Sequence, residues 1–242
     1  MRMSIAAAVI AASAATSACG HQRHEDAGPT VSRNYQVGAF QQIEVAGPYE
    51  VQVHTGANPG VSAQGPQKLL ERTVVEVKGD KLVIHPQQHN GWFSFGFSSN
   101  RGAKFDVTVP QLSGATIAGS GDIHVDKVRG DRFVGAVGGS GGLDVDNVAV
   151  QTLKLSIAGS GDVKAGAGTA QSADYDIAGS GGIDGGGVTV QQLKASIAGS
   201  GDVKARATGA ADISIMGSGD VSVSGGAKCS VSKHGSGDAH CS

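Results

Sequence analysis

The sequence predicts an all-β fold, a parallel β-helix (β-solenoid) with coils of about 20 residues and Gly-Ser-Gly corners. Apolar and polar residues alternate with a period of two on both sides of each corner, as in Leu153–Ile157, which is typical of strands with one buried face. Glycine supplies 39 of 242 residues, and the apolar residues are mostly Val, Ile, Leu and Ala. Because one such coil cannot bury its own apolar face, it must stack on copies of itself. The seven corners begin at Gly119, Gly139, Gly159, Gly179, Gly199, Gly217 and Gly235.

Residues 1–18 have the features of a signal peptide. Arg2 precedes an apolar run, Ile5–Ala15, that is too short to span a bilayer and is followed by small residues. Ser17-Ala18-Cys19 resembles a bacterial lipobox, although Leu is usual where Thr16 stands. We therefore predict lipidation of Cys19, with simple cleavage after residue 18 as the alternative.

The segment 19–30 is polar, contains Gly28-Pro29 and has no apolar period, so it is predicted to be a flexible tether. Together with the leader, it predicts an exported lipoprotein of the cell envelope whose partner membrane is the outer membrane. Whether the domain faces the periplasm or the cell surface is left open by the sequence. The formal net charge of −2 gives no reason to expect nucleic acid as a partner.

Residues 31–112 lack the repeat and are predicted to form irregular N-terminal coils. Phe40–Val53 and Leu82–His85 have the pattern of strands, and Gly79-Asp80 that of a turn between strands. Residues 68–72 could form a short helical turn. We expect this part to continue the solenoid and to cap its start, with a separate small β domain as the alternative.

Residues 113–242 are predicted to form seven regular coils whose outward charges alternate in sign. Opposite charges on neighbouring coils would lie about 4.8 Å apart and attract, so the alternation is expected only if each coil lies on the next. Five residues before the corner, successive coils carry Lys154, Asp174, Lys194 and Asp212. Five residues after it, they carry Asp144, Lys164, Asp184 and Lys204. Directly after the corner stand Asp122, Gly142, Asp162, Gly182 and Asp202, followed by Asp220 and Asp238, and these carboxylates are expected to bind turn amides.

The last two cysteines occupy inward positions of the final coil. Cys229 lies six residues before the corner at Gly235 and Cys241 lies six residues after it. In an exported protein this arrangement predicts a Cys229–Cys241 disulfide that closes the C-terminal end, where an open strand edge would otherwise be exposed. Two buried free thiols are the alternative.

Four sequence segments ahead of the repeats resemble those of a known family. They are Phe40-x-x-Ile43-x-Val45, Val51-x-Val53, Leu82-x-Ile84 and Val107-x-Val109-Pro110-x-Leu112, followed by Gly-Ser-Gly-Asp repeats. From Tyr35 to Cys241 the chain resembles the head GIN domain family of bacterial envelope proteins, which are grouped as auto-transporter adhesins. The resemblance implies a right-handed β-helix similar to pectin-lyase-like folds, in agreement with the preferred hand of parallel crossovers. It supplies no established catalytic residues.

Several groups of residues have side chains suited to chemical sites, and a structural explanation is favoured for each. Ile-Ala-Gly-Ser-Gly does not match a nucleophile elbow, and the corner serines are expected to form a hydrogen-bonded column. The corner aspartates supply too few oxygens for calcium. A polysaccharide-cleaving site would need clustered acids, for which the candidates are Asp174, Asp176 and Asp184 beside Lys164 and Lys204. A transition-metal site would use His234, Asp238 and His240.

An aromatic segment is the remaining candidate for binding. It contains Trp92, Phe93, Phe95 and Phe97, four of the ten aromatic residues. It could be a hydrophobic lid over the solenoid or an exposed patch for a protein, a glycan or self-association. We therefore predict a non-enzymatic envelope lipoprotein, without metal or cofactor, that serves as a tethered binding, adhesion or structural module. A polysaccharide-active enzyme of pectin-lyase-like shape is the alternative.

Overall fold

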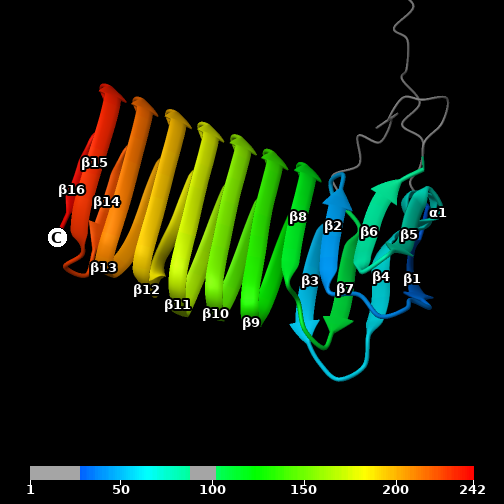
Figure 1. Ribbon diagram of the computed structural model, residues 1–242. Coiled ribbons are helices and arrows are strands. Elements are labelled where there is room, and N and C mark those ends of the chain that lie inside the picture. Colours follow the sequence, from blue (N-terminus) through cyan, green and yellow to red (C-terminus); the bar gives the residue numbers. More distant parts are fainter. Residues whose placement is uncertain (1–27, 88–101) are drawn as a thin grey trace, which may run out of the picture.

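The computed structural model describes residues 28–87 and 102–242, which form one 16-stranded sheet wound into a β-solenoid of about six turns (Figure 1). The predicted fold class is confirmed, and the seven corners bound six successive coils. The strands of the regular part are β8 (Gly114–Gly119), β9 (Asp122–Gly139), β10 (Gly142–Gly159), β11 (Asp162–Gly179), β12 (Gly182–Gly199), β13 (Asp202–Gly217), β14 (Val221–Ser224), β15 (Lys228–Gly235) and β16 (Ala239–Cys241).

Each long strand wraps once around the solenoid and pairs in parallel with the next coil, residue for residue. Leu143 pairs with Val163, and Ile157 pairs with Ile177, so equivalent residues of successive coils form columns. The inward columns are fully buried and apolar; Ile157, Ile177 and Ile197 are 2–3% exposed. The register between β12 and β13 shifts at Gly185/Thr189 and at Val190/Gln192, because the corner spacing falls there from 20 to 18 residues.

The corners require glycine at their first position. Gly159 has φ +136°, and a Cβ on it would overlap the carbonyl oxygen of Gly139 in the coil before. This close approach allows a ladder of backbone hydrogen bonds, in which the amide of each corner serine donates to the first glycine of the preceding corner at 2.9 Å, as from Ser160 to Gly139. The predicted hydrogen-bonded column of corner serines therefore forms through their backbone amides, while the serine side chains are exposed.

The N-terminal part continues the stack, but in an order that differs from the chain order. Its elements are β1 (Thr30–Tyr35), β2 (Gln42–Ala46), β3 (Glu50–Thr55), β4 (Gly60–Pro66), α1 (Gln67–Glu71), β5 (Thr73–Lys78), β6 (Lys81–Pro86) and β7 (Lys104–Val109). The β2 and β3 pair lies between β6 and β7 on one side and β8 and β9 on the other, all in parallel. Strands β1, β4 and β5 add antiparallel pairs at this end of the sheet.

This end has a bulkier core than the regular coils. The rings of Tyr49 and Phe105 meet edge to face with centroids 5.4 Å apart, and both residues are fully buried. The hydroxyls of Tyr49 and Thr73 lie 3.0 Å apart, and Thr73 donates to the carbonyl of Leu69 in α1. The short helix α1 and the turn between β5 and β6 lie where the sequence predicts them, at residues 68–72 and 79–80.

The C-terminal end is closed by covalent and polar groups. Cys229 and Cys241 are joined by a disulfide, with Cα atoms 6.7 Å apart. Lys233 stands in the column that is filled by isoleucine in the four coils before it, and its ammonium donates to Gly237 O at 3.3 Å and to Asp238 Oδ1 at 2.9 Å. A charge in an inward column at the last strand disfavours addition of a further strand.

The predicted signal peptide, the lipidation site Cys19 and the aromatic segment with Trp92, Phe93, Phe95 and Phe97 lie outside the described residues. So does most of the predicted tether. In the part of the chain that the structure describes, the single short helix does not have the length or the apolar character needed to cross a membrane.

Candidate functional site

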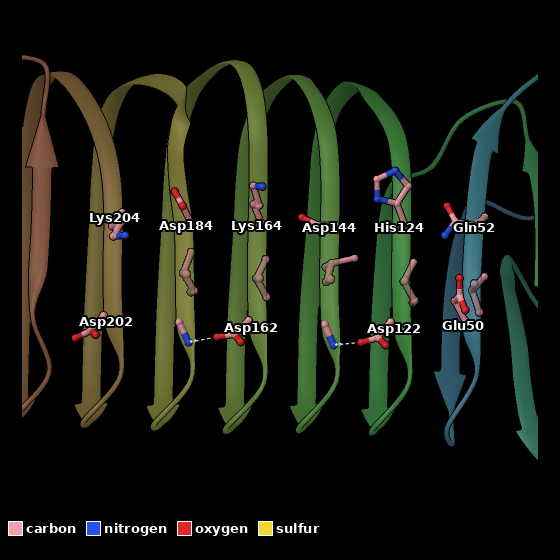
Figure 2. A pocket seen from close by; sticks show the side chains of 17 residues that line it. Glu50, Gln52, Asp122, His124, Asp144, Asp162, Lys164, Asp184, Asp202 and Lys204 are labelled. Carbon is pink, nitrogen blue, oxygen red and sulfur yellow. Dashed lines mark hydrogen bonds between the residues drawn. The ribbon is translucent and has the colours of Figure 1, made fainter. Parts of the chain in front are cut away.

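A groove runs along one lateral face of the solenoid, across successive coils (Figure 2). It has a volume of about 480 Å³, within the range of ligand-binding sites. Its floor is formed by the strand segments that follow each corner, and we call it the charged groove. Its polar lining residues are Glu50, Gln52, Asp122, His124, Asp144, Asp162, Lys164, Asp184, Asp202 and Lys204.

These side chains form two rows, because the parallel register places equivalent positions of each coil side by side. The first, which we call the corner row, lies next to the corners. It comprises Asp122, Gly142, Asp162, Gly182 and Asp202. The second, which we call the groove column, lies two residues further along each strand. It comprises Asp144, Lys164, Asp184 and Lys204, and His124 occupies the same position in the coil before Asp144.

The carboxylates of the corner row are held by backbone amides of the neighbouring coil. Asp122 Oδ1 accepts from Gly142 N at 2.8 Å, and Asp162 Oδ1 accepts from Gly182 N at 2.9 Å (Figure 2). In the intervening coils the amide is satisfied by a carbonyl instead, as from Asp162 N to Gly141 O at 3.2 Å. The predicted role of these aspartates in binding turn amides is therefore confirmed, and they alternate with glycines that leave a gap in every second coil.

The groove column behaves differently, since its charges make no ion pair with one another. All four side chains are exposed, and none lies within 4.0 Å of an opposite charge among the residues that the structure describes. Asp184 accepts one hydrogen bond, from Gly186 N at 3.1 Å. At the N-terminal end of the column, His124 Nε2 lies 3.1 Å from Asp146 Oδ2. The charged groove thus presents alternating charges to the exterior.

The column five residues before the corners, which we call the opposite column, shows the contrast. There Lys154 Nζ donates to Asp174 and to Asp176, both at 2.9 Å. The hydrogen bond to Asp174, followed in importance by that to Asp176, raises the pKa of Lys154. The next pair of this column, Lys194 and Asp212, is in register and exposed but makes no ion pair with another described residue.

A second hollow of about 690 Å³ lies over the strand segments that precede the corners. It is lined mostly by alanine, serine and the buried isoleucines, with Met216, 66% exposed, at one end. Asp176 lines this hollow, whereas Asp184 lines the charged groove. The acids considered for polysaccharide cleavage are therefore divided between two surfaces.

The predicted metal candidates also have a structural explanation. Asp238 is paired with Lys233, and Asp238 N donates to Asp220 Oδ1 at 2.8 Å. Within residues 28–87 and 102–242, no group of three or more His, Cys, Asp or Glu side chains is arranged to hold a metal ion. The chemistry available in the charged groove is binding through charges of both signs and through carboxylate hydrogen-bond acceptors.

A family model described as "Putative auto-transporter adhesin, head GIN domain" matches residues 39–227. No curated protein matches the chain. Among solved structures, a putative adhesin from Bacteroides fragilis NCTC 9343 is 26% identical, with a TM-score of 0.79, over 88% of this chain and 97% of its own.

Two further solved structures share the fold at lower identity. A protein from Parabacteroides distasonis ATCC 8503, described as a putative lipid binding protein, is 23% identical with a TM-score of 0.71, over 89% of this chain and 97% of its own. A putative adhesin from Parabacteroides merdae ATCC 43184 is 18% identical with a TM-score of 0.70, over the same shares of the two chains.

Proposed function

Because the chain belongs to the head GIN domain family, we propose that it is an exported, non-enzymatic binding module of the bacterial cell envelope. Its binding surface is the charged groove, and its anchor is a lipid on Cys19. The observation that carries the proposal is the groove column, a regular line of exposed charges that the fold itself leaves unpaired. Description of the B. fragilis relative as a putative adhesin supports a binding role rather than a catalytic one.

The solenoid is suited to present such a surface. The corner ladder and the residue-for-residue pairing of β9 to β12 fix the spacing of successive coils at about 4.8 Å. Groups on a preorganised sheet lose little conformational freedom on binding, compared with groups on a loop. The charged side chains can therefore contact an extended partner at regular intervals without rearrangement of the backbone.

The anchor is tested by fractionation of cells that make the full chain or its Cys19→Ser variant. We expect the full chain in the membrane fraction, labelled by a fatty-acid precursor, and the variant in the soluble envelope fraction without label. Equal distribution of both proteins, without label in either, would contradict the lipid anchor. Protease added to intact cells, with a cleavable tag after residue 242, then determines which face of the outer membrane the domain occupies.

The binding surface is tested by photo-crosslinking in cells. A photoreactive amino acid replaces Lys164 in the charged groove or, as a matched control, Lys194 in the opposite column. Both lysines are exposed and lie in long strands of the same solenoid, so neither substitution alters the core. We expect an adduct of lower mobility from position 164 and none from position 194. Adducts from both positions in equal yield, or from neither, would contradict binding through the groove.

A further inference from the structure

The order of charges in the groove column is complementary to itself when the order of the coils is reversed. Along the stack the column is Asp144, Lys164, Asp184, Lys204, and in reverse it is Lys, Asp, Lys, Asp. If two copies face each other with their solenoid axes antiparallel, Asp144 meets the partner's Lys204. Lys164 meets the partner's Asp184, and the two-fold axis repeats both contacts. Two chains placed in this way bring four pairs of opposite charges together.

The corner row fits the same arrangement. A two-fold axis along the strand direction, between the coils of Lys164 and Asp184, keeps each row opposite itself while it reverses the coils. Gly142 then faces the partner's Asp202, and Asp162 faces the partner's Gly182. Each carboxylate of these four coils meets a gap rather than a second carboxylate, so no like charges are opposed there. Over these four coils the two rows therefore agree on one alignment, the isologous contact of a symmetric dimer, whereas one coil further out Asp122 would face the partner's Asp220.

The grooves of two facing copies have the same spacing between coils, because both belong to the same solenoid. The groove charges repeat every two coils, or about 9.6 Å from the strand spacing. An extended peptide along the groove repeats every two residues, about 6.7 Å, and would lose register within a few residues. A polyproline II peptide repeats close to 9.3 Å, but such peptides dock in aromatic-lined grooves, and the lining residues here include no Phe, Tyr or Trp.

We propose that the charged groove is a self-recognition surface, and that its occupant is a second copy of this chain in antiparallel orientation. The inference rests on the proposed function and names the partner of that same groove. Four coils at about 4.8 Å give a contact near 19 Å long, which is small for a stable dimer, so single pairs should be weak. Many copies on one membrane would compensate through effective concentration.

Antiparallel pairing has a consequence for adhesion. β1 lies at one end of the solenoid and the C-terminus at the other (Figure 1). In the antiparallel pair, the two N-terminal ends therefore lie at opposite ends of the complex. If each chain is anchored through its N-terminal tether, this arrangement connects two facing membranes rather than two neighbours in one membrane. The groove would thus support cell–cell adhesion of a homophilic kind.

The test uses two charge variants of the full chain. D144K/D184K has a groove column of four lysines, and K164D/K204D has a column of four aspartates. Each should fail to recognise itself, whereas a mixture of the two should associate. We expect aggregation of cells that display the wild-type chain and of mixed cells that display one variant each, but not of cells with either variant alone. Sedimentation of purified full-length protein should show self-association at least about tenfold weaker for each variant.

The matched control exchanges charges in the opposite column, K194D/D212K, and should aggregate like wild type. Circular dichroism checks folding, and if a lysine or aspartate column prevents it, the neutral K164Q/K204Q variant should still abolish aggregation. Failure of the mixture to associate, or unchanged aggregation of the single variants, would overturn self-recognition. A groove adduct at position 164 that contains no second copy of the chain would also overturn it, while the proposed binding function would stand.

Discussion

The packing across the corner at Gly179 can be tested by the substitution Gly185→Ala. Tyr175 precedes this corner and Gly185 follows it, and a Cβ on Gly185 would overlap the Tyr175 hydroxyl and lie 2.7 Å from its Cζ. The preceding corner carries the smaller pair Leu155 and Ala165 at the equivalent positions. The glycine thus makes room for the tyrosine, and alanine there should cost about 1–3 kcal/mol through overpacking.

A double-mutant cycle isolates this effect. Tyr175→Leu loses apolar contacts, but it also removes a buried hydroxyl that has no hydrogen-bond partner among the described residues. Leaving such a group unsatisfied costs about 1–3 kcal/mol, so the single substitution should be nearly neutral. In the Y175L background, G185A recreates the pair of the preceding coil and should be neutral or stabilising. We expect a coupling energy of about 1–2 kcal/mol in favour of the double variant.

The assay is thermal unfolding followed by circular dichroism, with Gly186→Ala as control. A Cβ on Gly186 meets only Asp184 Oδ1 at 3.4 Å, an ordinary contact, so this variant reports the intrinsic effect of alanine for glycine. A change of 1 kcal/mol corresponds to about 2–4 °C in a domain of this size. An unchanged Tm for G185A alone, or an equal loss of Tm in the wild-type and Y175L backgrounds, would contradict the steric overlap between Tyr175 and a side chain at position 185.

Three further predictions concern the corners, the C-terminal end and alkaline pH. Gly159→Ala should cost at least about 3 kcal/mol, because of its positive φ and the overlap with Gly139 O; a soluble variant with wild-type Tm would contradict this. Cys229→Ser should cost about 2–3 kcal/mol and make the segment after residue 226 sensitive to protease, and equal digestion of both proteins would refute it. Burial, with a smaller effect of Asp184, raises the pKa of Tyr175, so the folded chain retains a proton that the unfolded chain releases above about pH 10. Stability should therefore be full below pH 10 and fall as the pH rises beyond it, less steeply in Tyr175→Phe; parallel pH curves in urea unfolding would exclude this contribution.

The regular coils could be predicted from the sequence because one period sets all of their long-range contacts. A spacing of 20 residues places Leu143 beside Val163 and assigns every inward and outward column at once. The N-terminal part has no such period. Its strand order, with β2 and β3 inserted between β6 and β7 and the first regular coil, depends on pairings that leave no repeat in the sequence. Only local features there were predictable, namely the strands within 40–53 and 82–85, the short helix and the turn.

The rows of the charged groove were visible in the sequence, but the groove was not. Alternation of Asp144 and Lys164 identifies an outward column, whereas a hollow depends on how the side chains of neighbouring rows lie. The compensation between Tyr175 and Gly185 was also missed. Its signal is the size relation across a corner, since the bulky residue before the corner is matched by a small residue after it. Comparing positions across each corner, rather than along columns, would have found it.

The period of two coils in the outward charges requires an explanation beyond the fold, because the backbone repeats with every coil. Contacts between neighbouring side chains account for part of it, as in the ion pair of Lys154 with Asp174. They do not account for the groove column, whose charges alternate in register without pairing to one another. Alternation there lowers repulsion within the stack, yet neutral side chains would do so equally well. What neutral side chains could not provide is complementarity to an opposing surface with the same spacing. The proposed interaction between chains would give the unpaired alternation such a role, and the charge variants D144K/D184K and K164D/K204D test it.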